Sequence, residues 1–125
     1  MKQRREDKLF IKTITDMVSS KQAFLSKIEV LDNNKKTAAL LPRTIGFYDE
    51  SHVYIVPDSA YAITNQHLKT FTSGYSLTLL ALQDKLKSNN LIVPDSDGRS
   101  CSRISVNGQR HRILKFKRKH FKINF

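Results

Sequence analysis

Cysteine is almost missing from this sequence, since Cys101 is the one thiol among 125 residues. A disulfide framework and a cysteine-rich zinc site both need several thiols, so both are excluded. Cys101 falls in a predicted strand with no base beside it, which favours an incidental thiol over a nucleophile. A chain without disulfides is typical of the cytoplasm, and that is the compartment we expect.

Long apolar runs and catalytic motifs are missing too. The run "LTLLAL" is far short of the ~18 residues that cross a membrane, and "MKQRREDKLF" lacks the apolar core of a secretion signal. "IGFYDES" and "PDSDG" match neither a phosphate-binding loop nor a calcium-binding loop. The four histidines share no metal-ligand spacing: His52, His67, His111 and His120. We therefore expect no enzymatic activity, no cofactor, no metal and no membrane partner.

Negative charge is absent after Asp97. Residues 99–125 carry nine of the 22 basic residues, and the other 13 are set against all 11 acidic residues. The formal net charge of +11 is therefore concentrated at the C-terminal end, while the rest of the chain is close to neutral. Such a cationic segment indicates an anionic partner, with nucleic acid favoured over an anionic membrane surface.

Hydrophobic spacing predicts one α+β domain over residues 1–125. An N-terminal extension, residues 1–44, contains a predicted helix over 7–20, a strand over 23–31 and a loop over 32–36. The predicted core, residues 45–125, begins with a hairpin of 45–48 and 52–56. A helix over 59–71, capped by Asp58, is joined by a short link to a helix over 76–89, capped by Ser76. A strand over 91–93 and a final hairpin that turns at Asn107-Gly108 complete the core.

The order helix, short turn, helix, strand and hairpin is that of a winged helix-turn-helix, whose second helix enters the major groove of DNA. The backbone at Tyr75 and Ser76, at the tip of helix 76–89, is expected to hold a phosphate. Charge on this helix is weak, because Asp84 opposes its two lysines, and an ordinary solvated face remains an alternative. The buried stripe is predicted to hold Leu79, Leu80, Leu82 and Leu86, and the DNA-facing side Thr78, Ala81, Lys85 and Ser88, with Lys87 beside them.

The two-residue turn at Asn107-Gly108 fixes the register of the last hairpin. Its predicted core face holds Ile104, Val106, His111 and Ile113, and its basic face holds Arg103, Ser105, Arg110 and Arg112, with Arg99 further down. Arg103 lies opposite Arg112, and like charges in that position destabilise a sheet. We expect phosphate groups to neutralise them, since guanidinium binds phosphate through paired hydrogen bonds. The alternative is a solvated basic edge that deters strand pairing.

Strict register also puts Leu114 and Phe116 on the arginine face. Either a bulge turns them away, or the basic face is only the distal half of the hairpin. We expect Phe116 and Phe121 to anchor in the core. The same segment adds candidate phosphate contacts from Lys115, Lys117, Arg118 and Lys119.

Three motifs follow one another within residues 45–120: "IGFYDESHVYIVPDS", "LIVPDSDG" and "NGQRHRIL". They resemble the C-terminal domain of replicative helicase and helicase–primase proteins of phages and integrative mobile elements, including cassette-chromosome helicases with an MCM-like AAA+ motor. The matching positions are Gly46-Phe47-Tyr48-Asp49, Val53 to Pro57, Leu91-Ile92, Gly98, Gly108, Arg110 and Arg112 to Leu114. The resemblance implies a DNA-binding domain that serves element replication, with the ATP-dependent motor upstream in the parent polypeptide.

The expected partner is DNA, whether duplex, forked or single-stranded. Two alternatives remain open at this point. A module that docks on the helicase motor or on a replication partner is favoured by the weak charge of helix 76–89. A standalone transcriptional regulator would need a dimer, and no dimerisation helix is evident.

Overall fold

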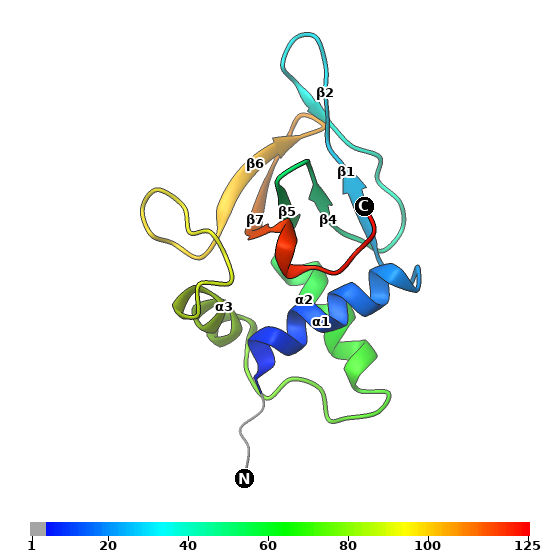
Figure 1. Ribbon diagram of the computed structural model, residues 1–125, viewed down its shortest axis with the longest axis vertical. Coiled ribbons are helices and arrows are strands. Elements are labelled where there is room, and N and C mark those ends of the chain that lie inside the picture. The colour runs from blue at the N-terminus through cyan, green and yellow to red at the C-terminus, as the bar shows by residue number, and fades with distance from the viewer. Residues whose placement is uncertain (1–4) are drawn as a thin grey trace.

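Residues 5–125, which the computed structural model describes, form an α+β fold of three α-helices, a mixed five-stranded sheet and a separate two-stranded ribbon. The helices lie together at one end and the ribbon projects from the other (Figure 1). The elements are α1 (Glu6–Ser19), β1 (Phe24–Lys27), β2 (Glu29–Val30), β3 (Lys36–Thr37), β4 (Thr44–Tyr48), β5 (His52–Ile55), α2 (Pro57–Leu68), α3 (Leu79–Ser88), β6 (Ser102–Val106), β7 (Gln109–Lys117) and a 3-10 turn (Arg118–His120).

The sheet has the strand order β1-β4-β5-β7-β6, and β2 pairs with β3 in the ribbon. β1 runs parallel to β4, and every other pair in the sheet is antiparallel. Gly46 allows β4 to approach β5 closely, since a Cβ there would overlap the carbonyl oxygen of Tyr54. The predicted hairpin of β4 and β5 is confirmed.

The core consists of two clusters, one on each face of the sheet. The larger cluster joins the helices to the sheet through Phe10, Ile14, Leu82, Leu114 and Phe116, among others. The smaller cluster lies on the opposite face beneath the base of the ribbon and contains Ile28, Ala38, Phe47, Tyr54, Val106 and Ile113. Residues 5–44 therefore contribute to the same core as the rest of the chain, through α1 and β1.

The register of the β6–β7 hairpin is the predicted one, with Val106 opposite Gln109 and Arg103 opposite Arg112. Asn107 and Gly108 both have positive φ angles, 56° and 75°, as this turn requires. Leu114 and Phe116 do lie on the arginine face and are fully buried there. The helices cover that end of β7, so the basic face is only the distal half of the hairpin.

Several predicted element boundaries are wrong. The strand predicted over 23–31 divides into β1 and β2, and Val30 is exposed. Both helices of the second half are shifted or shortened: Val56, not Asp58, is the N-cap of α2, and Thr78, not Ser76, is that of α3. Residues 91–93 form no strand, although the Val93 N–H donates to the Lys115 carbonyl oxygen at 2.7 Å. Leu80, predicted to belong to the buried stripe of α3, is exposed, and so is Phe71 after the end of α2.

The C-terminal segment packs back on the molecule. Phe121 is buried and its ring lies edge-on to Phe116, with 5.2 Å between ring centroids. Phe125 reaches Tyr48, with 4.8 Å between centroids. The prediction that Phe116 and Phe121 anchor this segment is confirmed. Nowhere in residues 5–125 is a helix long and apolar enough to cross a bilayer.

Candidate functional site

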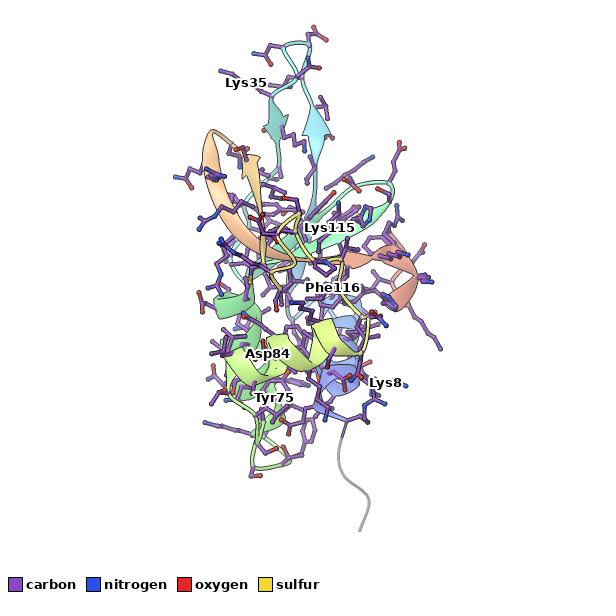
Figure 2. The ribbon with its side chains drawn as sticks, turned by 90° about the vertical axis from the view of Figure 1, so that its left-hand side faces the viewer. Lys8, Lys35, Tyr75, Asp84, Lys115 and Phe116 are labelled. Carbon is purple, nitrogen blue, oxygen red and sulfur yellow. The ribbon has the colours of Figure 1, made fainter. Side chains whose placement is uncertain are left out.

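The β6–β7 hairpin, the 94–101 loop and the start of α3 enclose a groove of about 820 Å³, which we call the arginine groove. Figure 2 views the molecule from this side, with Asp84 on α3 and Lys115 on β7 labelled. The three arginines of the predicted basic face line it together with Arg99. Tyr54 and Lys115, on the opposite face of the sheet, and Lys36, on the ribbon, line it too, so the groove reaches around the hairpin. Its basic lining residues are Lys36, Arg99, Arg103, Arg110, Arg112 and Lys115.

The arginines of the groove have no carboxylate partner among the described residues. The ion pairs formed within residues 5–125 join Arg5 to Asp7 and Lys12 to Asp16, far from the hairpin in sequence. Asp95 and Asp97 also line the groove, but neither forms an ion pair with its arginines, and Asp95 Oδ1 already accepts hydrogen bonds from the backbone N–H groups of Asp97 and Arg99, at 3.0 and 2.7 Å. The predicted like-charge pair of Arg103 and Arg112 is therefore present, and no ion pair formed within residues 5–125 neutralises it.

Arg112 connects the hairpin to α3. Its Nη2 donates to Oε1 of Gln83 over a long 3.5 Å. Cys101 lies beside the same guanidinium, and burial raises the pKa of its thiol although Arg112 opposes that shift. A thiol with a raised pKa is a poor nucleophile. This agrees with the expectation that Cys101 has no catalytic role.

The tip of the hairpin is held by the ribbon rather than projecting freely. The Asn107 side chain pairs with the backbone of Ala38 as a strand would: Oδ1 accepts from its N–H at 3.0 Å, and Nδ2 donates to its carbonyl oxygen at 2.8 Å. The Thr37 hydroxyl also donates to Asn107 Oδ1, at 2.9 Å. These bonds explain why Lys36, far away in sequence, lies at the arginine groove.

The predicted phosphate site before α3 is occupied by a carboxylate of the protein itself. Glu6, which is 1% exposed, accepts the backbone N–H groups of Ser76 and Leu77 at 2.8 to 3.0 Å and the Ser76 hydroxyl at 2.9 Å. The Tyr75 backbone N–H donates to Asn65 Oδ1 at 2.8 Å, its hydroxyl donates to Thr64 at 2.7 Å, and its ring stacks on Tyr61. The prediction that Tyr75 and Ser76 hold a phosphate is therefore wrong, because the donors are already used.

The other predicted contacts are dispersed. Thr78 caps α3 by accepting the Ala81 N–H at 3.2 Å, and Lys85 and Lys87 lie outside the arginine groove. Arg118 donates to the carbonyl oxygens of Asp49 and Glu50, at 3.1 and 3.2 Å, and its guanidinium lies 4.2 Å from the centre of the Phe125 ring. Arg118 therefore anchors the C-terminal segment.

The remaining lysines point elsewhere. Lys117 is exposed opposite His52, on the sheet face that does not carry the arginines. Lys119 lines a second groove of about 780 Å³ between α1 and the C-terminal segment. That groove is also basic, with Lys8, Lys12, His120 and Lys122 in its lining.

Gln83 and Lys36 are groove residues that sequence reasoning missed. Gln83 follows Leu79 by four positions, so it lies on the inner stripe of α3, and a polar residue there is a detectable signal. Lys36 gives no such signal, because only the docking of Asn107 on the ribbon brings it near. Among residues 5–125 no cluster of histidine, cysteine and carboxylate side chains could hold a metal ion.

Comparison with protein-family models, with curated proteins and with solved structures gives no match. The role of the arginine groove is therefore inferred from its chemistry.

Proposed function

We propose that this chain is a non-catalytic DNA-binding domain of the winged-helix type, which holds the phosphate backbone in the arginine groove. The observation that carries the proposal is that Arg103, Arg110 and Arg112 share one groove and have no carboxylate partner there. Phosphate neutralises such a cluster, and the release of its counterions favours binding.

The arrangement of elements supports the winged-helix reading. The order β5, α2, α3, β6, β7 places a hairpin after two helices, and β7 lies between β5 and β6 in the sheet. Two features depart from the simple pattern. Residues 69–78 connect α2 to α3 in place of a short turn, and the hairpin tip is docked on β3. Phosphate binding therefore falls to the flank of the hairpin rather than its tip.

The test is a titration of labelled duplex, forked and single-stranded DNA by fluorescence anisotropy over a range of salt concentrations. Roughly five phosphate contacts predict a slope of log K against log salt of about −4 to −5. An affinity that does not change with salt, or no binding to any of the three forms, would contradict the proposal.

A protein-docking module is the second candidate, and one observation favours it. Four aliphatic residues on the ribbon and the loop after it are 51–61% exposed: Val30, Leu31, Leu40 and Leu41. Exposed apolar side chains can mark a protein contact when they form one patch. A stable complex with a helicase motor, together with no binding to nucleic acid, would favour this function over the first.

The resemblance to mobile-element helicases supports a narrower proposal, that the domain assists an ATP-dependent motor in engaging DNA. The reading frame around the gene tests it directly. An AAA+ motor encoded upstream in the same frame supports the proposal, and a complete frame without any motor contradicts it.

A further inference from the structure

Gln83 carries a buried hydrogen-bond donor with no acceptor. The residue is 2% exposed. Among the residues that the structure describes, its Nε2 is the one buried side-chain nitrogen or oxygen atom that has no hydrogen-bond partner. Leaving such a group unpaired destabilises the fold, because its hydrogen bond to water is lost and not replaced. Leucine or methionine would fit an inner position of α3 without that cost, so a polar group here calls for a ligand or partner.

The surroundings of Gln83 define the chemistry of that ligand. Gln83 lines the arginine groove together with Arg103, Arg110 and Arg112. Its Oε1 accepts the hydrogen bond from Arg112, and its Nε2 is a donor without an acceptor. The carboxylates of Asp95 and Asp97 also line the groove, but they form no ion pair with these arginines. The donors of Gln83 and the three arginines, most of them positively charged, fit an anion with several acceptor oxygens. Among the anions of nucleic acid, the phosphate diester has this character.

The contact between Gln83 and Arg112 is loose enough to open. At 3.5 Å it is longer than a normal hydrogen bond, so little free energy holds Arg112 to the amide. The terminal torsion of glutamine is broad, so the amide can turn its Nε2 toward the groove without a movement of α3. Arg112 is exposed and can approach the same ligand from the side of the hairpin.

We propose that Gln83 and Arg112 form a subsite for one phosphate group, to which Gln83 Nε2 and the Arg112 guanidinium donate together. The subsite rests on the proposed function, since it would hold one phosphate of the nucleic-acid backbone. It ties the hairpin to α3 through the ligand, and it contributes a neutral donor to an interface that is otherwise charged. A free phosphate compound is the other ligand that offers the same acceptor oxygens to this subsite.

The first experiment compares Gln83→Met with the matched variant Gln66→Met, which makes the same change on the exposed face of α2. Gln83→Met should weaken DNA binding about 5- to 10-fold and leave the salt slope unchanged, because no charge is lost. It should also raise the melting temperature or leave it unchanged, because it removes an unpaired buried donor. Arg112→Ala should weaken binding and also reduce the slope by about 0.9. DNA affinity of Gln83→Met equal to that of Gln66→Met would overturn the subsite while leaving the proposed function standing.

The second experiment titrates inorganic phosphate at constant ionic strength, with chloride as the control, and follows side-chain amide signals by nitrogen-15 NMR. The Gln83 amide should shift and saturate with phosphate, the Gln66 amide should not, and Arg112→Ala should abolish the shift. A Gln83 amide that responds equally to chloride, or to neither anion, would overturn the subsite. A phosphate-specific shift in a protein that binds no DNA would support the subsite, overturn the proposed function and identify a free phosphate compound as the ligand.

Discussion

At the scale of single residues, the buried Glu6 has the clearest structural role. Its buried carboxylate accepts hydrogen bonds from the chain before α3, although it lies 70 residues earlier in the sequence than Ser76. Hydrogen bonds to a charged group contribute more than neutral ones, and leaving their partners unpaired costs more still. The sequence correctly predicted that these donors bind an anion, but the anion expected was phosphate. No residue near Ser76 in the sequence indicates that α1 supplies a carboxylate to them.

Replacing this carboxylate tests its role. Glu6→Gln puts an amide nitrogen where a backbone N–H now finds an oxygen, so we expect the free energy of unfolding to fall by about 2–3 kcal/mol. Glu50→Gln, at an exposed position, is the matched control and should change it little. Urea denaturation measures both. Equal stability of the two variants would show that the Glu6 carboxylate is dispensable.

Asp7 makes the fold sensitive to acid. Burial alone would raise the pKa of Asp7, but hydrogen bonds from Arg5, from Asn89 and from the Lys8 backbone lower it to about 2. A carboxylate whose pKa is lower in the folded than in the unfolded chain stabilises the fold above its unfolded pKa. That stabilisation is lost as the pH falls from about 4 through 2.

The pH dependence of unfolding tests this carboxylate. Between pH 5 and pH 2, the unfolding free energy of the native chain should fall by on the order of 2 kcal/mol more than that of Asp7→Asn. Asp32→Asn, in an exposed loop, is the control and should keep the native acid dependence. Parallel pH curves for the native chain and Asp7→Asn would contradict the role assigned to Asp7.

At the scale of elements, the β6–β7 hairpin was the most predictable part of the fold. Asn107-Gly108 is a local signal that fixes the register, and every predicted pair is present. The ends of α2 and α3 were less predictable, because serine is by residue type at least as good a cap as threonine, and this favours Ser76 over Thr78. The choice between them depends on Glu6, because its carboxylate accepts the Ser76 hydroxyl and so occupies the side chain that would otherwise cap the helix.

The docking of the hairpin on the ribbon can be tested at Asn107. Asn107→Gly keeps the positive φ angle of the turn but loses the bonds to Thr37 and Ala38, so the unfolding free energy should fall by about 1–3 kcal/mol. Asn107→Ala should cost about 1 kcal/mol more, because alanine is strained at positive φ. Asn34→Gly makes the same change at the ribbon turn, where φ is also positive, and serves as the control. Asn107→Gly as stable as Asn34→Gly would mean that the docking bonds contribute nothing.

At the scale of the whole molecule, the charge asymmetry was visible in the sequence, but its division over the surface was not. Five predicted basic residues line the arginine groove on the hairpin and its loop, whereas Arg118 and Lys119 lie elsewhere. The prediction could not separate them, because the path of the chain after β7 depends on Phe121 and Phe125 packing back on the core. A count of charges gives the sign of the partner and leaves its position open.

The most direct test of the central claim compares two triple variants that lose the same charge from different surfaces. One is Arg103→Ala, Arg110→Ala and Arg112→Ala, in the arginine groove, and the other is Lys27→Ala, Lys35→Ala and Lys69→Ala, at exposed positions outside it. DNA affinity is measured for both against salt concentration. We predict that the arginine variant binds at least about 100-fold more weakly and that its salt slope loses about 2.7, while the lysine variant stays close to the native chain. Equal losses in the two variants would contradict the claim, because they would mean that net charge rather than the arginine groove binds DNA.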